Sequence, residues 1–369
     1  MSADCDLCST PPFVPHGCTK KRLVECLSVR RPRSKNDDIC LGFPMSDYLE
    51  LGQPGFLRHS RGKAAPPPGQ ICSNERHETH VIEAPEADPE LQQVRDWFTI
   101  RTDFSQLMGD AVEDAIYYVL DGARTHRFDL LDDRVDSDER RSVGTKLQFH
   151  VLENFDLPKL HHPDTEVDGI GLEIKGTIGR TWTIPKEGQC GVTLLIKADL
   201  HKWSHRAWLM RTHRAWLNDG RNNDGKRGIR ARALSEYAYQ LYPETSLRPN
   251  PLKLLSAEQL DLVFGTAGQE TRLKYLFSYL PDVVIPRAVI LTVCAGKLDP
   301  IRRARAIRQG MEASNIALLC GKWHAQSEMA KRFGHDLTGA AWVAVPWEMV
   351  SGSDSLSAEV RAQMRGYRA

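Results

Sequence analysis

Apolar residues recur at helical spacing in three stretches of the first half of the chain. The first stretch follows Asp88 and Pro89, which suit the N-cap and the first turn of a helix. Stretches at 104–120 and from about 137 onward predict two more helices, and Asp121-Gly122 suits the end of the second. The residues expected to face inward are Leu91, Val94, Trp97, Phe98, Val112, Ala115, Ile116, Val119, Val143, Leu147, Val151 and Leu152.

Beyond residue 160 the apolar period shortens from 3.6 residues towards 2. Alternating apolar and polar residues at 165–167 and 170–175 predict two strands, and the apolar run at 192–197 predicts a third, more buried one. Helices followed by strands indicate an α/β or α+β core.

The second half of the chain reads as a separate domain. A polar, glycine-rich stretch at 218–230 is interpreted as an interdomain linker. Two short helices joined by the turn Gly265–Gly268 are typical of a helix-turn-helix, and strands after them favour its winged version. The pattern predicts helices near 232–241, 256–264 and 270–280, and strands near 287–294, 316–320 and 341–345.

The two ends of the chain carry little of this periodicity. Residues 1–85 are rich in Pro, Gly, Ser and Arg and cannot bury much apolar surface, so we expect disorder there. The predicted organisation is a disordered extension at 1–85, a first domain at 86–217, a linker at 218–230, a second domain at 231–350 and a tail at 351–369.

The overall composition is that of an ordinary globular protein. The 369 residues include 49 Lys and Arg against 48 Asp and Glu, a net charge of +1, which excludes a highly charged tail protein. No run of 18 apolar residues exists, so no transmembrane helix is expected. The N-terminus lacks the apolar segment of a secretory signal, and we therefore expect a cytoplasmic protein.

Six of the nine cysteines lie in the first 72 residues. Cys5-x-x-Cys8 could form half of a zinc site, but no second Cys or His pair follows at finger or ribbon spacing. The alternatives are a disordered leader or a start codon assigned too far upstream. Cys190, Cys294 and Cys320 lie in apolar sequence and are interpreted as buried thiols.

The most informative segment is a predicted β-hairpin at 163–175. Asp168-Gly169 between two strand-like runs predicts a two-residue turn. That turn sets Val167 opposite Ile170 and, further along, Asp164 opposite Glu173. Residues directly opposed share a sheet face, and Lys175 lies on that face as well.

Two like charges held face to face are destabilising unless something neutralises them, and a divalent cation would do so. Carboxylate oxygens are the ligands Mg²⁺ prefers, and Lys175 would then lie beside its water or a phosphate, which indicates metal-assisted phosphodiester hydrolysis. Alternating charges are also common on a solvated strand face. Glu166 is a candidate third acid, His162 would face Lys175 if the pairing extends that far, and Asp168 is expected to serve the turn alone.

Basic residues concentrate between 197 and 232, where ten Lys and Arg stand against three Asp. Such density suits contact with DNA phosphates, although a solvated linker is the alternative, and Trp203, Trp208 and Trp216 are expected in the core. In the helix near 270–280, exposed polar residues could reach DNA, and the basic stretch 301–308 could do the same. The candidate DNA-binding residues are Arg221, Lys226, Arg227, Arg230, Thr271, Arg272 and Lys274.

The hairpin, written Pro163-Asp164 … Glu173-Ile-Lys175, resembles the PD-(D/E)xK nucleases, and the chain from about 88 to 350 resembles the NaeI-type restriction endonucleases. The resemblance implies a restriction-endonuclease-like α/β core, with helices flanking a mixed sheet, followed by a winged helix-turn-helix domain. The stretches that carry it are Asp121–Thr125, Gly144-Thr145, Gly169–Lys175, Trp182–Pro185 and Arg287–Val293.

By this resemblance the protein is a type II restriction endonuclease. It would be a homodimer that uses Mg²⁺ to cut both strands of double-stranded DNA at a short palindrome, with a second site for effector DNA. Asp164 and Glu173 would be metal ligands and Lys175 the catalytic lysine. The family has a further acid on the third helix where this chain has Gln148, which can hydrogen-bond a water but supplies no charge.

Two other functions remain open from the sequence. Residues 169–175 also resemble MutH-like enzymes, which would make the protein a nicking or repair endonuclease. Gln148 favours a second alternative, a DNA-binding regulator with an inactive nuclease domain.

Overall fold

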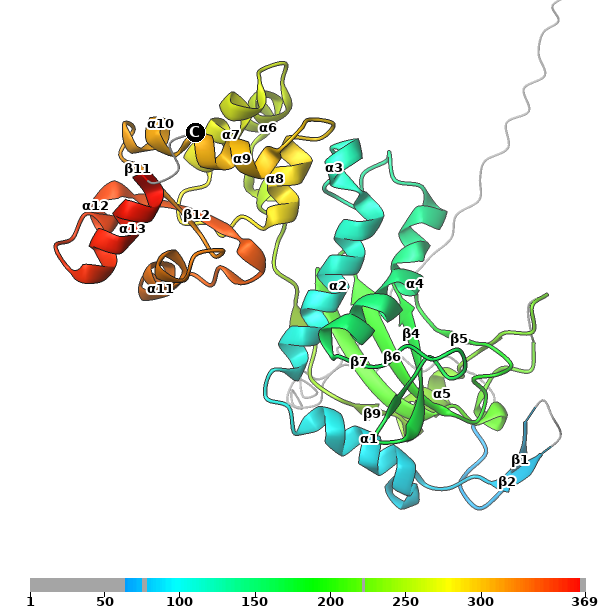
Figure 1. Cartoon of the computed structure of the whole chain (residues 1–369). Helices are drawn as coiled ribbons and strands as arrows, with labels where there is room; N and C mark the ends of the chain where they lie inside the picture. The colour runs from blue at the N-terminus through cyan, green and yellow to red at the C-terminus, as the bar shows by residue number, and fades with distance from the viewer. Residues whose placement is uncertain (1–63, 75–77, 221–222, 366–369) are drawn as a thin grey trace, which may run out of the picture. The chain divides into compact units, whose positions relative to one another are not determined.

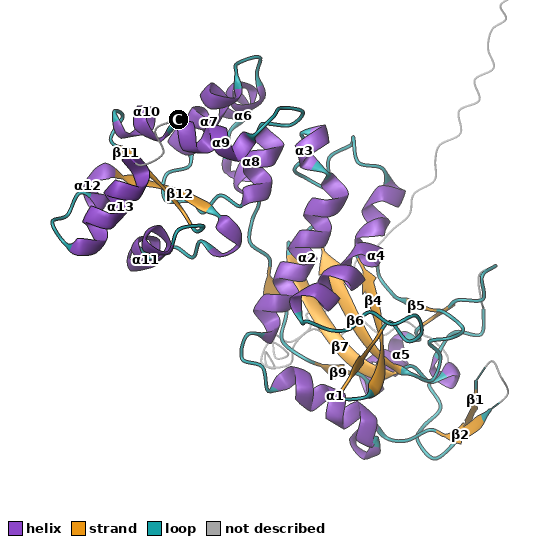
Figure 2. Cartoon of the chain, in the orientation of Figure 1, coloured by secondary structure: helices purple, strands orange, loops and turns teal. Residues whose placement is uncertain are grey.

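The structure is a computed structural model that describes residues 64–74, 78–220 and 223–365. It is a mixed α/β protein whose elements pack into two main groups, shown by chain position in Figure 1 and by element type in Figure 2. Within the described part, no helix is both long and apolar enough to cross a bilayer.

The first group is built around a mixed sheet, as the sequence predicts. Its order is β10-β7-β6-β4-β3, and β9 also pairs with β7. β4 and β6 are parallel, whereas the β3–β4 and β6–β7 pairs are antiparallel. The strands are β3 (Thr165–Val167), β4 (Ile170–Thr177), β6 (Val192–Asp199), β7 (Ser204–Arg211), β9 (Tyr239–Gln240) and β10 (Thr245–Ser246).

Both faces of the central strands are buried. Leu194 and Ile196 of β6 face the larger core, where α2 (Phe104–Leu120) and α4 (Ser137–Asn154) lie side by side across the sheet (Figure 1). Leu195, between them, points into a second core on the opposite face. This two-sided burial explains why β6 reads as an unbroken apolar run.

The three helices predicted before the sheet are confirmed. α1 (Pro89–Thr99) begins where expected, because the Asp88 side chain accepts a hydrogen bond from the N–H of Leu91. Asp88 also pairs with Arg211 of β7, which ties the start of the helix to the sheet. α2 ends at Asp121, which has φ 45°, and a short α3 (Gly122–Thr125) follows.

The expected disorder of residues 1–85 is wrong for the part that the structure describes. β1 (Ile71–Ser73) and β2 (Thr79–Val81) form an antiparallel hairpin, followed by a 3-10 turn η1 (Pro85–Ala87). The neighbouring Ile82 is fully buried beside Trp182 and Trp216. The segment completes a core built by distant residues, and its own composition gives no sign of that. Residues 1–63, including Cys5 and Cys8, lie outside the described residues.

The prediction that residues 218–230 form an interdomain linker is also wrong, because the segment pairs with strands of the first group of elements. β8 (Arg227–Gly228) pairs with β5 (Thr183–Ile184), and Leu217 bridges Ile229. The next helix, α5 (Ala231–Tyr237), packs in the same core as η2 (Arg214–Trp216), so it belongs with the first group of elements. A glycine-rich polar composition correctly predicts a loop. It does not reveal that contacts with residues distant in the sequence fix the loop to the domain.

The second group follows Asn250 and contains the predicted helix pair. α6 (Ala257–Phe264) and α7 (Gln269–Tyr279) are joined by a short turn, and a hairpin of β11 (Ile316–Cys320) and β12 (Trp342–Pro346) lies beyond them. The remaining elements are η3 (Pro251–Leu254), α8 (Arg287–Val293), α9 (Pro300–Ala306), α10 (Arg308–Glu312), α11 (His324–Arg332), η4 (Thr338–Ala340), α12 (Trp347–Val350) and α13 (Ser355–Arg365).

Two predictions for this second group are wrong. The strand expected at 287–294 is helix α8, because Pro286 sets its start and the apolar run buries Val289, Ile290 and Val293. Short apolar runs do not distinguish a helix from a buried strand. The tail expected at 351–369 contains α13, whose Val360 and Met364 lie four residues apart and pack beside the hairpin.

The β11–β12 hairpin is covered on both faces. Leu318 and Ala344 face the core formed with α7 and α8, while Leu319 and Val343 face the core formed with α11 and α13. An exposed wing needs at least one face in solvent, so the winged form of the helix-turn-helix is not confirmed for this hairpin.

A buried histidine makes the first group sensitive to acid. His205 of β7 is 2% exposed, and its Nδ1 lies 2.7 Å from the Tyr242 hydroxyl. Burial lowers the pKa of His205 to about 4, below the roughly 6.5 of an unfolded histidine. The unfolded state therefore binds the proton first, and stability is lost as pH falls from about 6.5 towards 4, by up to roughly 3 kcal/mol.

The test is chemical denaturation of the wild type and of His205→Gln between pH 7 and pH 4. The wild type should lose more free energy of unfolding over this interval than the variant does. Replacement of the exposed His201 by Gln serves as the control and should leave the wild-type dependence in place. Equal pH dependence in wild type and His205→Gln would show that this histidine is not held neutral by the fold.

Candidate active site

The predicted hairpin is present with the predicted register. Asp168 and Gly169 have φ of 50° and 79°, the left-handed pair that a type I′ turn requires. Val167 pairs with Ile170, and Thr165 pairs with Leu172. The ladder ends there, so Asp164 lies just beyond its last pair. His162 is therefore not paired with Lys175, and Glu166 is exposed.

Asp164 is held close to β4 by direct contacts. Its carboxylate Oδ2 accepts a hydrogen bond of 2.8 Å from the backbone N–H of Ile174. Lys159 Nζ lies 3.7 Å from the other oxygen, Oδ1. Asp164 is only 9% exposed, so these donors rather than bulk water stabilise its carboxylate.

Glu173 and Lys175 complete the cluster on the same face of the sheet. Lys175 Nζ lies 2.5 Å from Glu173 Oε1 and 3.4 Å from Asp164 Oδ2, so one ammonium contacts both carboxylates. Glu173 is 4% exposed. The two predicted acids and the predicted lysine are therefore brought together.

The loop between β5 and β6 covers Glu173. A Cβ added at Gly188 would lie 3.2 Å from Glu173 Cδ, so the glycine lets the loop backbone approach the carboxylate closely. Thr212, just beyond β7, donates a hydrogen bond to the Gly188 carbonyl. The environment of Glu173 is thus set by a loop that is anchored to the neighbouring strand.

Gln148 approaches the lysine from helix α4. Gln148 and Lys175 both line a cavity of about 270 Å³, together with Lys226. The amide nitrogen Nε2 of Gln148 is buried and has no hydrogen-bond partner among the described residues. A buried polar atom without a partner indicates a site that receives a further group.

The helix reaches this position through a close backbone crossing. A Cβ added at Gly144 of α4 would lie 2.5 Å from the carbonyl oxygen of Gly176 in β4. A Cβ added at Gly176 would lie 2.7 Å from the Gly144 carbonyl oxygen. The two glycines therefore let α4 touch β4 one turn before Gln148.

A family model described as restriction endonuclease NaeI matches residues 103–345, more than half of the chain. The chain belongs to the NaeI restriction endonuclease family. Membership makes it a site-specific deoxyribonuclease that acts on DNA, and restriction enzymes of this kind typically need a divalent metal. A comparison with curated proteins finds no match.

The match covers the whole cluster, from Gln148 on α4 to Lys175 on β4. The donor set also fits a hard cation, because Asp164 and Glu173 offer carboxylate oxygens from one face of the sheet.

The basic residues predicted near the linker differ in their surroundings. Lys226 lines the cavity beside Lys175 and pairs with Asp224 at 2.9 Å. Arg227 donates to backbone carbonyls of the same loop, and the side chain of Arg230, 14% exposed, donates to Leu217 and Ala64 carbonyls. These two arginines hold the loop together. Arg221 lies outside the described residues.

The predicted reading face of α7 has the expected exposure. Thr271 and Lys274 are exposed, while Leu273, Leu276 and Phe277 are buried. Arg272 instead donates hydrogen bonds to the carbonyls of Gly265, Ala267 and Val293, and so fixes the turn between α6 and α7. In the alternative basic stretch, Arg302 and Arg303 are exposed and Arg308 is buried.

Sequence patterns missed one charged neighbour of the cluster. Lys159 lies in an irregular segment before β3, where no periodicity predicts the direction of a side chain. The backbone turns back between these residues, and the Leu160 N–H donates a hydrogen bond to the Asp164 carbonyl. This turn brings the Lys159 ammonium close to the Asp164 carboxylate.

The glycine crossing gives a direct test of how the site is positioned. Gly144→Ala places a methyl group against backbone that cannot rotate away, and this outweighs the better helix propensity of alanine. We expect the free energy of unfolding to fall by about 1–3 kcal/mol and DNA cleavage to fall with it. Urea denaturation and a plasmid cleavage assay measure the two effects.

Gly179→Ala is the matched control, since its nearest neighbour to an added Cβ is the Thr177 hydroxyl at 3.4 Å. That variant should keep both stability and activity. A Gly144→Ala protein as stable and as active as the Gly179→Ala protein would contradict the close crossing.

Proposed function

We propose that the protein is a type II restriction endonuclease that uses Mg²⁺ to hydrolyse both strands of DNA at a short palindromic site, leaving 5′-phosphate ends. The observation that carries this proposal is the Lys175 ammonium between the buried carboxylates of Asp164 and Glu173, within a chain of the NaeI family. The enzyme would act in the cytoplasm.

In this proposal Asp164 and Glu173 hold the metal ion through their carboxylate oxygens. Bound Mg²⁺ would supply Lewis-acid chemistry and neutralise charge on the scissile phosphate. To act, Lys175 Nζ would move slightly away from Glu173. It would then donate a hydrogen bond to the attacking water or to a phosphate oxygen, and so align the water with the phosphorus for attack. The backbone N–H of Ile174 keeps the Asp164 carboxylate oriented.

Gln148 takes the position of a third acid in the family pattern. Its amide would hydrogen-bond a water in the cavity that it shares with Lys175, and this fits its unpaired buried nitrogen. An amide adds no negative charge, so metal binding would depend on Asp164 and Glu173 alone. The expected consequence is a higher Mg²⁺ requirement than three acids would give.

DNA would be held by contacts from both groups of elements. Lys226 lines the cavity and would meet a phosphate near the scissile bond, and Arg221 stands five residues earlier in the sequence. Thr271 and Lys274 on the exposed face of α7 would reach a groove in a helix-turn-helix arrangement, at a second, effector DNA. Such phosphate contacts make binding strongly dependent on salt.

A homodimer is part of the proposal because a palindrome presents the same sequence on both strands. A two-fold axis in the protein would place one cluster of Asp164, Glu173 and Lys175 on each strand. Each strand is then cut by its own active site, so no active site has to move from one strand to the other.

Two alternatives give different products. A MutH-like nicking enzyme would leave supercoiled plasmid as open circles with one cut strand. A DNA-binding regulator with an inactive nuclease domain, the alternative favoured by Gln148, would bind DNA without metal and leave plasmid intact in Mg²⁺ and Mn²⁺. Linear plasmid with two cut strands, whose sequenced ends fall at one palindrome, supports the restriction enzyme.

Lys175→Ala should abolish plasmid cleavage in Mg²⁺ while DNA binding persists. The ammonium is the group expected to act on the water or phosphate, whereas most contacts with DNA come from other residues. Lys331→Ala removes an exposed lysine on α11, paired with Glu328, and should cleave like the wild type. Undiminished cleavage by Lys175→Ala would reject the assignment.

Mg²⁺ binding should be visible without any DNA. A ligand that binds only the folded state raises its stability, so Mg²⁺ should raise the melting temperature of the wild type. Asp164→Asn and Glu173→Gln each remove a charged ligand and should abolish this rise. Asp168→Asn, in the exposed turn, is the control and should keep it. A similar rise in all four proteins would place the ion elsewhere.

A further inference from the structure

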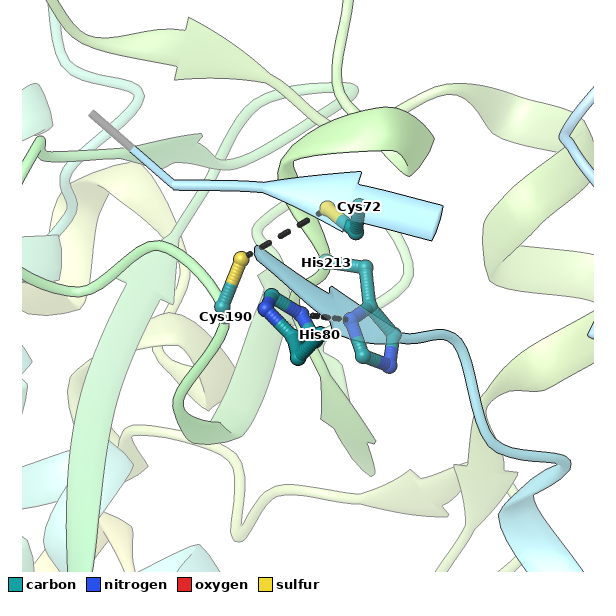
Figure 3. A group of neighbouring side chains, drawn as sticks. All are labelled: Cys72, His80, Cys190 and His213. Carbon is teal, nitrogen blue, oxygen red and sulfur yellow. Dashed lines mark hydrogen bonds between the residues drawn. The ribbon is translucent and has the colours of Figure 1, made fainter. Parts of the chain in front are cut away.

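Two cysteines and two histidines converge away from the carboxylate cluster. Cys72 lies on β1 and His80 on β2, while Cys190 precedes β6 and His213 follows β7 (Figure 3). One potential ligand atom from each residue lies within 4.8 Å of the other three. Cys72 and His213 are each 2% exposed, and the other two are partly buried.

The spacing of these atoms matches a tetrahedral ion site. With Zn–S near 2.3 Å and Zn–N near 2.05 Å, a tetrahedron has edges of about 3.8 Å between sulfurs and about 3.3 Å between nitrogens. Cys72 Sγ lies 3.8 Å from Cys190 Sγ, and His80 Nε2 lies 3.0 Å from His213 Nδ1. These two separations are close to the edges of such a tetrahedron, and all four donors lie within 4.8 Å of one another.

The chemistry of the donors selects the ion. Two thiolates and two imidazoles in a tetrahedron suit Zn²⁺, whereas Mg²⁺ takes oxygen ligands. Both cysteines are free thiols, not a disulfide. The backbone N–H of Arg214 points at Cys190 Sγ from 3.4 Å, the kind of donor that supports a metal-bound thiolate.

We propose that Cys72, His80, Cys190 and His213 bind one structural Zn²⁺ ion. All four coordination positions are filled by protein atoms, so the ion has no open position for substrate and its role is to hold the fold together. In this proposal Cys190, which the sequence suggests is a buried thiol, is a metal ligand together with Cys72.

The ion would add a cross-link between the β1–β2 hairpin and two other segments of the first group of elements. The β1–β2 hairpin supplies Cys72 and His80 from strands of only three residues each, too short to be stable alone. Cys190 comes from the loop whose Gly188 packs on Glu173, and the Cys190 N–H donates to the Thr212 carbonyl. The zinc site therefore fastens the hairpin to the loop that covers one of the predicted catalytic acids.

The first test is the zinc content of the full-length protein, purified without added metal. Elemental analysis should find one Zn²⁺ that Cys72→Ser and Cys190→Ser lose. Cys294→Ala and Cys320→Ala remove buried thiols outside the cluster and should keep the ion. Cys5→Ser with Cys8→Ser should also keep it. Loss of the ion in that double variant, or its retention in Cys190→Ser, would overturn the proposal.

A second measurement guards against variants that fail to fold. Co²⁺ substituted into the wild type should give the intense visible bands of a tetrahedral site and a thiolate-to-cobalt charge-transfer band. His80→Cys keeps four ligands, so it should retain one metal ion while the charge-transfer band grows by about half, as expected for three thiolates instead of two. A wild-type spectrum of octahedral Co²⁺, or an unchanged band in His80→Cys, would overturn the assignment.

Stability gives a readout that is independent of DNA cleavage. Removal of the ion by a strong chelator should lower the melting temperature of the wild type, and Zn²⁺ but not Mg²⁺ should restore it. Thiol titration of the native, metal-free protein should find Cys72 and Cys190 reduced. A disulfide between them in the freshly purified protein would show a redox pair in place of a metal site.

Discussion

The contact between one ammonium and two buried carboxylates is the constraint on which this site depends. Asp164 and Glu173 are almost withdrawn from water, where an unpaired carboxylate is costly. Lys175 contacts both carboxylates, and Lys159 lies 3.7 Å from Asp164, so two ammonium groups offset the charges that the fold withdraws from water. The surrounding backbone keeps the two acids close together, which leaves carboxylate oxygens on one face of the sheet where a cation could bind.

The local part of this site could be predicted from sequence. Asp168-Gly169 fixes the turn, the turn fixes the register, and the register places the acids and Lys175 on one face. These steps use only neighbouring residues. The position of Gln148 was available through the family resemblance alone, because its approach depends on a crossing between Gly144 and Gly176 that no periodicity reveals.

Predictions were wrong where distant residues decide the structure. β7 lies in the basic stretch at 197–232, where charge density alone suggests an exposed surface, yet its Arg211 is paired with Asp88, more than a hundred residues earlier. Its charge is satisfied inside the protein. The β1–β2 hairpin was missed for the same reason, because the core that it completes belongs to Trp182 and Trp216.

The burial of the β11–β12 hairpin on both faces limits where the second group of elements can accept substitutions. Leu318, Leu319, Val343 and Ala344 are all inside, so a substitution there alters packing before it alters any contact with a ligand. A substitution on a helix surface that faces solvent, such as the side of α7 carrying Thr271 and Lys274, leaves this packing in place. The hairpin is thus a fixed platform, and the outer surface of α7 can change without loss of the core beneath it.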